Sequence, residues 1–379
     1  MRRREANALG AAVRRFAADP ARNWPIGVAL LVVVLIVWWA SRPTHPAAPA
    51  GGSDDTAPVV TDTAGQPGDY LFCFWNVENL FDDQEDRRLA VDRPYDTWFA
   101  RDAAARTLKY RRLSEALVKL NDGRGPDILA CVEVESVRAA ELLRDALNDR
   151  IPDKTIHYRT VLMKEVSGGR HIAPAIITRL SARPEQTRLV GPQLRILEGH
   201  IDVNGADLTV LATHWTSHVS DDQGGRRDRY ADLIYRAYRD KAARDPNVDV
   251  LICGDFNDPP DSPGVTDHLH ATGDRDAVLR SRPDLLLDLM AGKDPNRFGT
   301  HYYHSKLLIY DQIVVAPGML DAAGWSCDPD SVMAVNTLTR PGSRVRAPWR
   351  FGNEKDSTFE RGYSDHFPVT VRLKVQGGQ

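Results

Sequence analysis

The segment YLFCFWNV, residues 70–77, decides the fold class of this chain. It is apolar at almost every position, and polar residues follow it at once. Two more runs of the same kind follow, DILACVEV at 127–134 and VDVLICGDFN at 248–257. Strands that are apolar throughout are buried on both faces, which is typical of layered α/β domains. The three runs therefore predict an α/β domain whose sheets are covered on both sides.

Outward from these runs, further strand-like segments alternate with amphipathic segments of helical period. Helices are expected at 101–121, around 138–147 and around 226–244. Further strands are expected in HYRTVLM (157–163), APAIITRL (173–180), LRILEGHIDV (194–203), DLTVLATHW (207–215), LLIYDQIVVA (307–316) and HFPVTVRLKV (366–375). No internal repeat of fixed period occurs. About 310 residues are compatible with one large domain, and sheets this extensive favour a sandwich with helices outside.

Polar residues recur where the apolar runs end. An asparagine or aspartate after a strand is most often a turn former, and a lone histidine is most often a surface or capping group. Asp311 differs, because apolar residues bracket it and a buried carboxylate needs a partner. Separate coincidences at all of these places are hard to accept, so these residues are functional candidates: Asn76, Glu133, His214, Asp255 with Asn257, Asp311, and Asp365 with His366.

The blocks around these residues resemble a known superfamily. FWNVENLF, CVEVES, ATHWTSH, ICGDFND, YDQIVV and YSDHFPV occur in the order found in the endonuclease/exonuclease/phosphatase superfamily. Pancreatic deoxyribonuclease, abasic-site endonucleases, neutral sphingomyelinases and inositol polyphosphate 5-phosphatases belong to it. The resemblance extends from about residue 69 to 375. It implies a four-layered α/β sandwich, in which two packed mixed sheets are flanked by helices.

The resemblance also implies a metal site. Asn76, Glu133 and Asp365 match the positions of metal ligands, with Glu133 as the main one. Carboxylate and amide oxygens suit Mg²⁺ or Mn²⁺ better than zinc. The expected cofactor is therefore Mg²⁺ or Mn²⁺.

By the same resemblance, the remaining candidates take catalytic roles. Asp255 orients or deprotonates the attacking water, and Asn257 holds a phosphate oxygen or the metal. His366 contacts the scissile phosphate, while Asp311 fixes its tautomer and favours its charged form. His214 supplies a second phosphate contact, and the sequence does not identify the carboxylate that should pair with it.

One segment departs from the pattern of the relatives. GGRHIAPAIITRL, residues 168–180, falls where they commonly carry an acidic residue before an apolar strand, and Ala173-Pro174 stands there instead. Arg170 or His171 is a candidate substitute that contacts phosphate; the alternative is that both are loop residues.

The N-terminus predicts the location. Residues 24–40, WPIGVALLVVVLIVWWA, are an uncharged apolar run of 17 residues, long enough for a membrane helix. Six arginines and two acids precede it, so the positive-inside rule leaves residues 1–23 in the cytoplasm and exports the rest. A cleaved signal peptide is the alternative, but the apolar run exceeds the usual length and no good small-x-small cleavage site follows it. Residues 41–68 read as a disordered tether to a catalytic domain at 69–379.

Charge and cysteine content narrow the function less. Residues 1–68 hold seven Lys/Arg and five Asp/Glu, which leaves 42 basic and 47 acidic residues, a net charge of −5, in the remainder. No global positive field attracts nucleic acid, so a polyanionic substrate must meet a local patch and metal. Cys73, Cys131 and Cys253 lie in strand-like runs, as buried thiols do.

Three functional hypotheses follow, and the first is an extracytoplasmic nuclease acting as a monomer. The second is a phosphoesterase for phospholipid head groups or small phosphoesters, for which a membrane tether is useful. The third is an inactive binding module, which the intact candidate residues argue against. Two arginine clusters could bind phosphates, with Trp349 and Phe351 stacking a base, or could lie in solvated loops: Arg226, Arg227 and Arg229; and Arg340, Arg344, Arg346 and Arg350.

Overall fold

A computed structural model describes residues 68–86, 88–166, 170–191 and 193–376. The predicted cytoplasmic N-terminus (1–23), membrane helix (24–40) and nearly all of the tether (41–68) lie outside these residues. Among the helices that are described, none has the length and apolar character needed to cross a bilayer.

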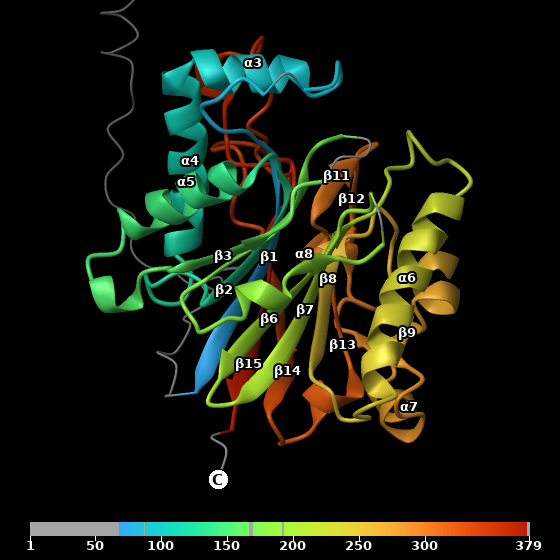
Figure 1. Ribbon diagram of the computed structural model, residues 1–379. Coiled ribbons are helices and arrows are strands. Elements are labelled where there is room, and N and C mark those ends of the chain that lie inside the picture. Colours follow the sequence, from blue (N-terminus) through green and yellow to red (C-terminus); the bar gives the residue numbers. More distant parts are fainter. Residues whose placement is uncertain (1–67, 87, 167–169, 192, 377–379) are drawn as a thin grey trace, which may run out of the picture. The chain divides into compact units, whose positions relative to one another are not determined.

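Two mixed sheets form the centre of the described domain (Figure 1). The six-stranded sheet has the order β14 (Trp325–Ala334), β15 (Val369–Val375), β1 (Asp69–Leu80), β2 (Ile128–Val134), β4 (Ala173–Thr178), β3 (Thr160–Met163). The seven-stranded sheet has the order β5 (Arg188–Leu189), β6 (Ile196–Val203), β7 (Ala206–His214), β8 (Val250–Asp255), β13 (Asp311–Val315), β10 (Leu286–Asp288), β9 (Ala271–Thr272). A hairpin of β11 (His301–Tyr303) and β12 (Lys306–Leu308) stands apart.

Helices cover the outer face of each sheet (Figure 1). On the side of the six-stranded sheet lie α3 (Arg93–Arg101), α4 (Ala103–Val118) and α5 (Val137–Asn148). On the side of the seven-stranded sheet lie α6 (Gly225–Ala242) and the short α7 (Arg275–Arg280), while α8 (Pro295–Phe298) precedes the hairpin. The mixed α/β architecture predicted from the apolar runs is therefore confirmed.

Alternation along the strands builds the layers. In β1, Phe72 and Phe74 belong to the cluster between the sheets, together with Leu251 of β8. Cys73 and Trp75 point the other way, into the cluster that Leu113 of α4 completes. A third cluster joins the seven-stranded sheet to α6. Because both faces of each sheet are covered, the central strands are apolar at almost every position.

Most predicted elements occur, and the differences have physical reasons. The helix expected at 101–121 begins only at Ala103, because the Asp102 side chain caps it by accepting the backbone N–H of Ala105. The segment at 307–316 divides into β12 and β13. Strand β14 was not predicted, since WSCDPDSVMA lies at a sheet edge, is half exposed, and lacks a continuous apolar run.

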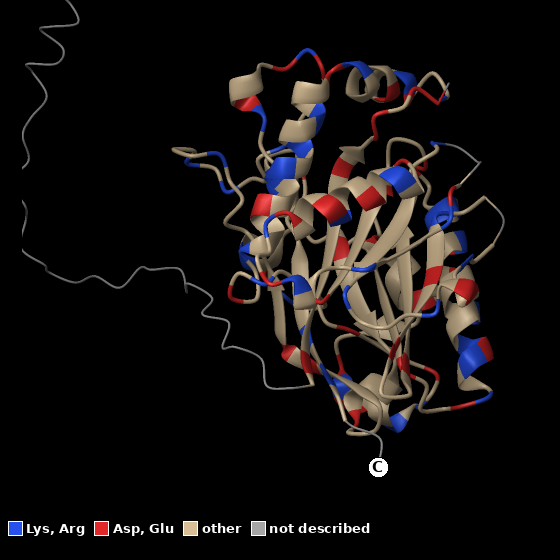
Figure 2. Ribbon diagram, turned by 60° about the vertical axis from the view of Figure 1, so that its left-hand side comes forward, with Lys and Arg blue, Asp and Glu red and all other residues tan. Residues whose placement is uncertain are grey.

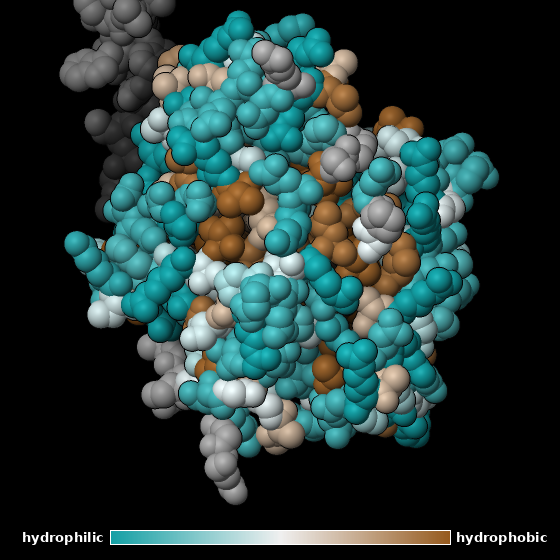
Figure 3. Space-filling model, viewed as in Figure 1, coloured by the Kyte–Doolittle hydropathy of each residue, from teal (hydrophilic) through white to brown (hydrophobic). Residues whose placement is uncertain are grey.

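The surface carries no single-sign field in the orientation shown. Basic and acidic residues are interspersed along the helices and loops in Figure 2. In Figure 3, apolar side chains are visible mainly in recesses between polar ones. The view in Figure 2 therefore shows no extended surface of one charge sign.

Candidate active site

Strand register brings three of the predicted residues into one row. His214 ends β7 and lies opposite Asp255, the last residue of the parallel strand β8. Asp311 begins β13 and lies opposite Asp255 on its other side. Gly254 permits this close arrangement, because a Cβ there would lie 2.5 Å from the Thr213 carbonyl oxygen of β7. One end of the seven-stranded sheet thus presents Asp255 between His214 on β7 and Asp311 on β13.

The six-stranded sheet supplies the other half of the site. Asn76 lies in β1, and Asp365 with His366 lies in the segment that leads into β15. Ser364 ties these elements together, because its hydroxyl donates to the Asn76 carbonyl oxygen at 2.6 Å. The Trp75 indole N–H donates to the His366 carbonyl oxygen at 2.8 Å. Side chains from both sheets therefore converge on one edge of the sandwich.

Asp255 is the centre of this arrangement. Its Oδ2 accepts a hydrogen bond from Asn76 Nδ2 at 3.0 Å, and it lies 3.7 Å from Nε2 of both His214 and His366. Its Oδ1 accepts the backbone N–H of Asn257 at 2.9 Å. Burial raises the pKa of Asp255 to about 7, although His366 opposes this effect. A carboxylate in this range can exchange a proton near neutral pH.

His366 is paired with Asp311, as the resemblance implied. Nδ1 of His366 lies 2.7 Å from Oδ2 of Asp311, and both side chains are buried. Burial alone would lower the pKa of His366, but the carboxylates of Asp311 and Asp255 outweigh it and hold the pKa well above its usual value. The imidazole is therefore a cation that presents Nε2 to the site.

His214 has the opposite character. Burial lowers its pKa well below the usual value, and the positive charges of Arg195, His366 and Arg170 lower it further. The neighbour of its Nδ1 is a guanidinium nitrogen of Arg195 at 3.2 Å, where the resemblance led us to look for a carboxylate. The surroundings of the two histidines that flank Asp255 thus favour opposite states, the charged form of His366 and the neutral form of His214.

Two of the predicted metal ligands, Asn76 and Glu133, lie at or near strained backbone. Glu133 has φ +66°, and Glu78 and Asn79 have φ +51° and +55°, left-handed values that are uncommon for residues other than glycine. They fall where the pairing of β1 with β2 is irregular, between Asn76 and Leu80. The Asn79 backbone N–H donates to Glu133 Oε2 at 2.8 Å, which orients this carboxylate. Such strain is concentrated at functional sites.

The donor set fits a hard divalent cation. The carboxylates of Glu78, Asp365 and Glu133 all act electrostatically on the buried amine of Lys109. Burial, followed by repulsion from Asp365, raises the pKa of Glu78 to about 7, against the effect of Lys109. Gathered carboxylate and amide oxygens of this kind suit Mg²⁺ or Mn²⁺. The ligand role of Asn76, Glu133 and Asp365 stays a prediction, while Glu78 accepts the backbone N–H groups of Phe351 and Gly352.

Three residues near the site were missed or left open by the sequence. His301 of β11 stacks on His366 with ring centroids 4.3 Å apart, and its Nδ1 bonds the Asp365 carbonyl oxygen. Arg170 is fixed by Asp92, 2.6 Å from its Nε, and by Asn79, and its charge acts on Glu133. No sequence pattern indicated Arg195, which the structure places in contact with His214.

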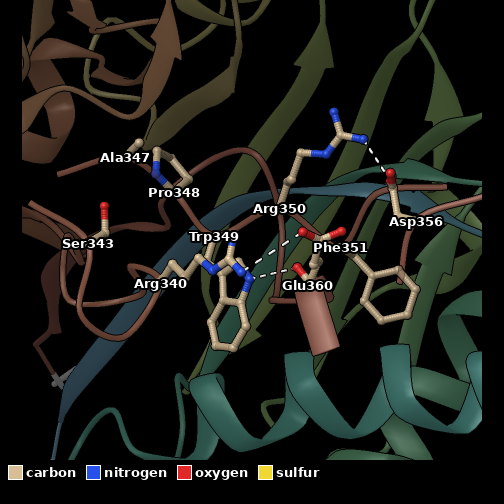
Figure 4. Close-up of a pocket in the computed structure, with 9 residues that line it drawn as sticks. All are labelled: Arg340, Ser343, Ala347, Pro348, Trp349, Arg350, Phe351, Asp356 and Glu360. Atoms are coloured by element: carbon tan, nitrogen blue, oxygen red, sulfur yellow. Dashed lines mark hydrogen bonds and ion pairs between the residues drawn. The ribbon is translucent and has the colours of Figure 1, made fainter. Parts of the chain in front are cut away.

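Three arginines of the two predicted clusters, Arg227, Arg340 and Arg350, lie beside carboxylates. Arg227 is buried, and its Nε donates to Asp258 at 2.8 Å. In the loop before Tyr363, Arg350 pairs with Asp356 at 2.8 Å, and Arg340 lies 4.0 Å from Glu360 (Figure 4). A hollow of about 290 Å³ is lined by Arg340, Arg350, Asp356 and Glu360 together with Ser343, Ala347, Pro348, Trp349 and Phe351. A phosphate there would compete with the carboxylates of Asp356 and Glu360 for the arginines, so we assign the hollow no role in binding phosphate.

Comparisons with known proteins agree with the geometry. A model of the Endonuclease/Exonuclease/phosphatase family matches residues 71–375. No curated protein matches the chain.

Three solved structures align with most of the chain. Truncated TDP2 of Caenorhabditis elegans is 15% identical with a TM-score of 0.49, and the alignment covers 82% of this chain and 99% of that one. Danio rerio TDP2 complexed with a single-strand DNA product is 14% identical with a TM-score of 0.47, covering 81% and 99%. A family protein from Bacteroides thetaiotaomicron is 14% identical with a TM-score of 0.46, covering 81% and 98%. At these identities and scores, the likenesses carry no argument about function.

Proposed function

The chain belongs to the endonuclease/exonuclease/phosphatase family, and we propose that it is a divalent-metal-dependent phosphoesterase that hydrolyses phosphodiester bonds. The family match confirms the resemblance drawn from the sequence blocks. The observation that carries the proposal is the position of Asp255, held by Asn76 between the charged His366 and the neutral His214. This arrangement can activate water and receive a phosphoryl group at one point.

Asp255 acts as the base in the proposed reaction. Its Oδ2 takes a proton from a water molecule as that water attacks phosphorus in line with the leaving alcohol. The P–O bond to the new hydroxyl forms while the ester P–O bond breaks, the leaving oxygen takes a proton from solvent, and the products are a phosphomonoester and an alcohol. Asn76 and the Asn257 backbone N–H keep the carboxylate of Asp255 oriented throughout.

The surrounding groups stabilise the charge that develops on the phosphoryl oxygens. His366, kept cationic by Asp311, and His214, a neutral donor, both present Nε2 toward the point where the phosphate binds. A Mg²⁺ or Mn²⁺ ion bound by Asn76, Glu133 and Asp365 would polarise a phosphoryl oxygen and offset negative charge. Desolvation strengthens each of these interactions, because the side chains of Asp255, His214 and His366 are almost completely buried.

The proposed substrate is nucleic acid, and the proposed location is outside the cytoplasm. The alternative substrate class is a phospholipid head group or another small phosphoester, which the apolar run at 24–40 favours because it would place the site at a bilayer. The same run and its preceding arginines support a single-pass anchor with the catalytic domain exported. Proteolysis of intact cells and of inside-out vesicles tests this orientation, since only exported chains are cut from the outside.

A substrate panel tests the proposed function. The full chain, purified in a mild detergent with Mg²⁺ or Mn²⁺, is given plasmid DNA, RNA, bis-p-nitrophenyl phosphate and sphingomyelin. Cleavage of nucleic acid that disappears with EDTA and in Asp255→Ala supports the nuclease. Hydrolysis of lipid or small esters alone supports the alternative substrate class. No hydrolysis of any substrate by a folded, metal-binding chain contradicts the proposal.

A further inference from the structure

Arg195 occupies a defined position behind His214. The ladder of β6 and β7 pairs Ile196 with Thr213, so the next residues outward, Arg195 and His214, are cross-strand neighbours. The His214 backbone N–H donates to the Arg195 carbonyl oxygen at 3.1 Å. The Arg195 guanidinium then reaches along the ring, and its Nη1 lies 3.2 Å from His214 Nδ1.

The hydrogen bond between Arg195 and His214 can run in only one direction. A guanidinium has five N–H donors, carries its charge at all ordinary pH values and has no acceptor. Nδ1 of His214 must therefore offer its lone pair to Arg195. In a neutral imidazole the other nitrogen then carries the hydrogen, and that nitrogen, Nε2, is the one that faces Asp255.

We propose that Arg195 is a positioning residue that holds His214 as the neutral Nε2–H tautomer, so that His214 is an uncharged hydrogen-bond donor to the phosphoryl group. This inference rests on the proposed phosphoesterase function for its consequence, but the tautomer itself is a property of the chain. It gives the two histidines separate tasks. His366 supplies charge, and His214 supplies a directed hydrogen bond without adding another cation.

The groups around His214 favour the neutral form. Three cations act on it, namely Arg195, His366 and Arg170, while Asp255 is the anion that faces its Nε2. A proton on Nδ1 would point an N–H at a guanidinium N–H, so protonation would break the hydrogen bond and add repulsion. Together with burial, this keeps His214 neutral as the pH falls through the range where an exposed histidine titrates.

Arg195 is itself anchored to the site. Its Nη2 donates to the Trp215 carbonyl oxygen at 3.1 Å, and the same oxygen accepts the side-chain N–H of Asn257 at 3.2 Å. Its backbone N–H donates to the Tyr230 hydroxyl of α6 at 3.3 Å. The carbonyl that locates Arg195 therefore also locates Asn257, which follows Asp255 closely in the chain. These contacts fix the guanidinium in front of Nδ1.

The experiment compares Arg195→Met, which removes the hydrogen-bond donor to His214 Nδ1, with Arg195→Lys, which keeps a charged N–H donor. Arg183→Met is the matched control, because Arg183 also pairs with β6, through Asp202, but away from the catalytic residues. In the full chain with Mg²⁺ and bis-p-nitrophenyl phosphate, Arg195→Met should lower kcat on the order of 10- to 100-fold, as expected for a residue that orients another group. KM should change little, Arg195→Lys should recover part of kcat, and the control should match the wild type.

Two readouts separate positioning from a structural role. In Arg195→Met, the pH profile of kcat should gain an ionisation on its acid side, because His214 can then be protonated. Nitrogen-15 spectra of histidine-labelled full chain, with His214→Gln to assign the signal, should show an unprotonated Nδ1 and a protonated Nε2. The assignment should hold across the acid range in the wild type and be lost in Arg195→Met.

The proposal is overturned if the wild-type His214 carries its hydrogen on Nδ1 or is doubly protonated at neutral pH. It is also overturned if Arg195→Met leaves the tautomer and the pH profile unchanged. The spectra need no substrate, so they judge this inference even where the substrate panel gives no hydrolysis. Should Arg195→Met fail to fold, Arg195→Lys and the wild-type spectra still decide.

Discussion

The pair of His366 and Asp311 gives the sharpest quantitative prediction. Asp311→Asn removes the carboxylate charge and keeps the shape of the side chain. The two charged atoms are 2.7 Å apart and buried. At that separation and an effective dielectric constant of about 20, Coulomb's law gives an attraction of about 6 kcal/mol.

This attraction is large enough to decide the charge of His366. Loss of this carboxylate should therefore lower the pKa of His366, because Asp311 is the strongest influence that raises it. Burial, which already opposes the charge, then leaves the imidazole neutral at pH 7. The phosphoryl group loses its cationic donor, and kcat should fall by about 10²- to 10⁴-fold.

The assay measures kcat and KM for bis-p-nitrophenyl phosphate at pH 7 with saturating Mg²⁺. The matched control is Asp288→Asn, because Asp288 is an equally buried aspartate on β10, which pairs with β13, but it lies outside the site. Its kcat should equal that of the wild type. The double variant with His366→Gln should be no slower than either single variant, because the two residues act as one unit.

A kcat of Asp311→Asn that matches that of Asp288→Asn would refute the reasoning. An additive double variant would refute it as well, since independent losses mean that Asp311 does not act through His366. Thermal unfolding of each variant checks that a lower kcat does not come from loss of folded protein.

Three further predictions concern stability and metal. Burial raises the pKa of Asp288 from 3.8 to about 7, so the stability contributed by its protonated form is present below pH 3.8 and is lost as pH rises through 7. Asp288→Asn should therefore become more stable to heat relative to the wild type as pH rises from 4 to 8. A difference in melting temperature that stays constant over this range would contradict the prediction. Glu133→Gln should weaken Mn²⁺ binding in calorimetry at least about tenfold, and unchanged affinity would remove Glu133 from the ligand set. Leu251→Ala, between the sheets, should cost about 2–5 kcal/mol of unfolding free energy in urea.

The sequence predicts the strands better than their partners. The runs at 70–77, 127–134 and 248–257 identify β1, β2 and β8, because burial on both faces makes them apolar throughout. Asn76 and Asp255 are identified as site candidates because they are polar residues at the ends of these apolar runs. The sandwich follows from these features, since covered sheets need layers on both sides.

What the sequence did not reveal depends on register and loop placement. Arg195 lies 19 residues before His214 in the chain, and only the β6–β7 ladder makes them neighbours. The electrostatic effect of Lys109 on Glu78 requires α4 to be packed on its sheet. His301 comes from a short hairpin with no apolar pattern. Pairwise contacts of this kind leave no periodic signal in the sequence.

The central claim is that this chain hydrolyses phosphodiesters with a water molecule activated by Asp255 and a divalent cation. The most direct measurement follows bis-p-nitrophenyl phosphate hydrolysis by the full chain in ¹⁸O-enriched water, with mass spectrometry of the phosphomonoester product. The account predicts one ¹⁸O atom on phosphorus, formed with Mg²⁺ or Mn²⁺ and abolished by EDTA and by Asp255→Ala. Product formation that persists in EDTA or in Asp255→Ala, or a phosphomonoester without the label, would contradict it.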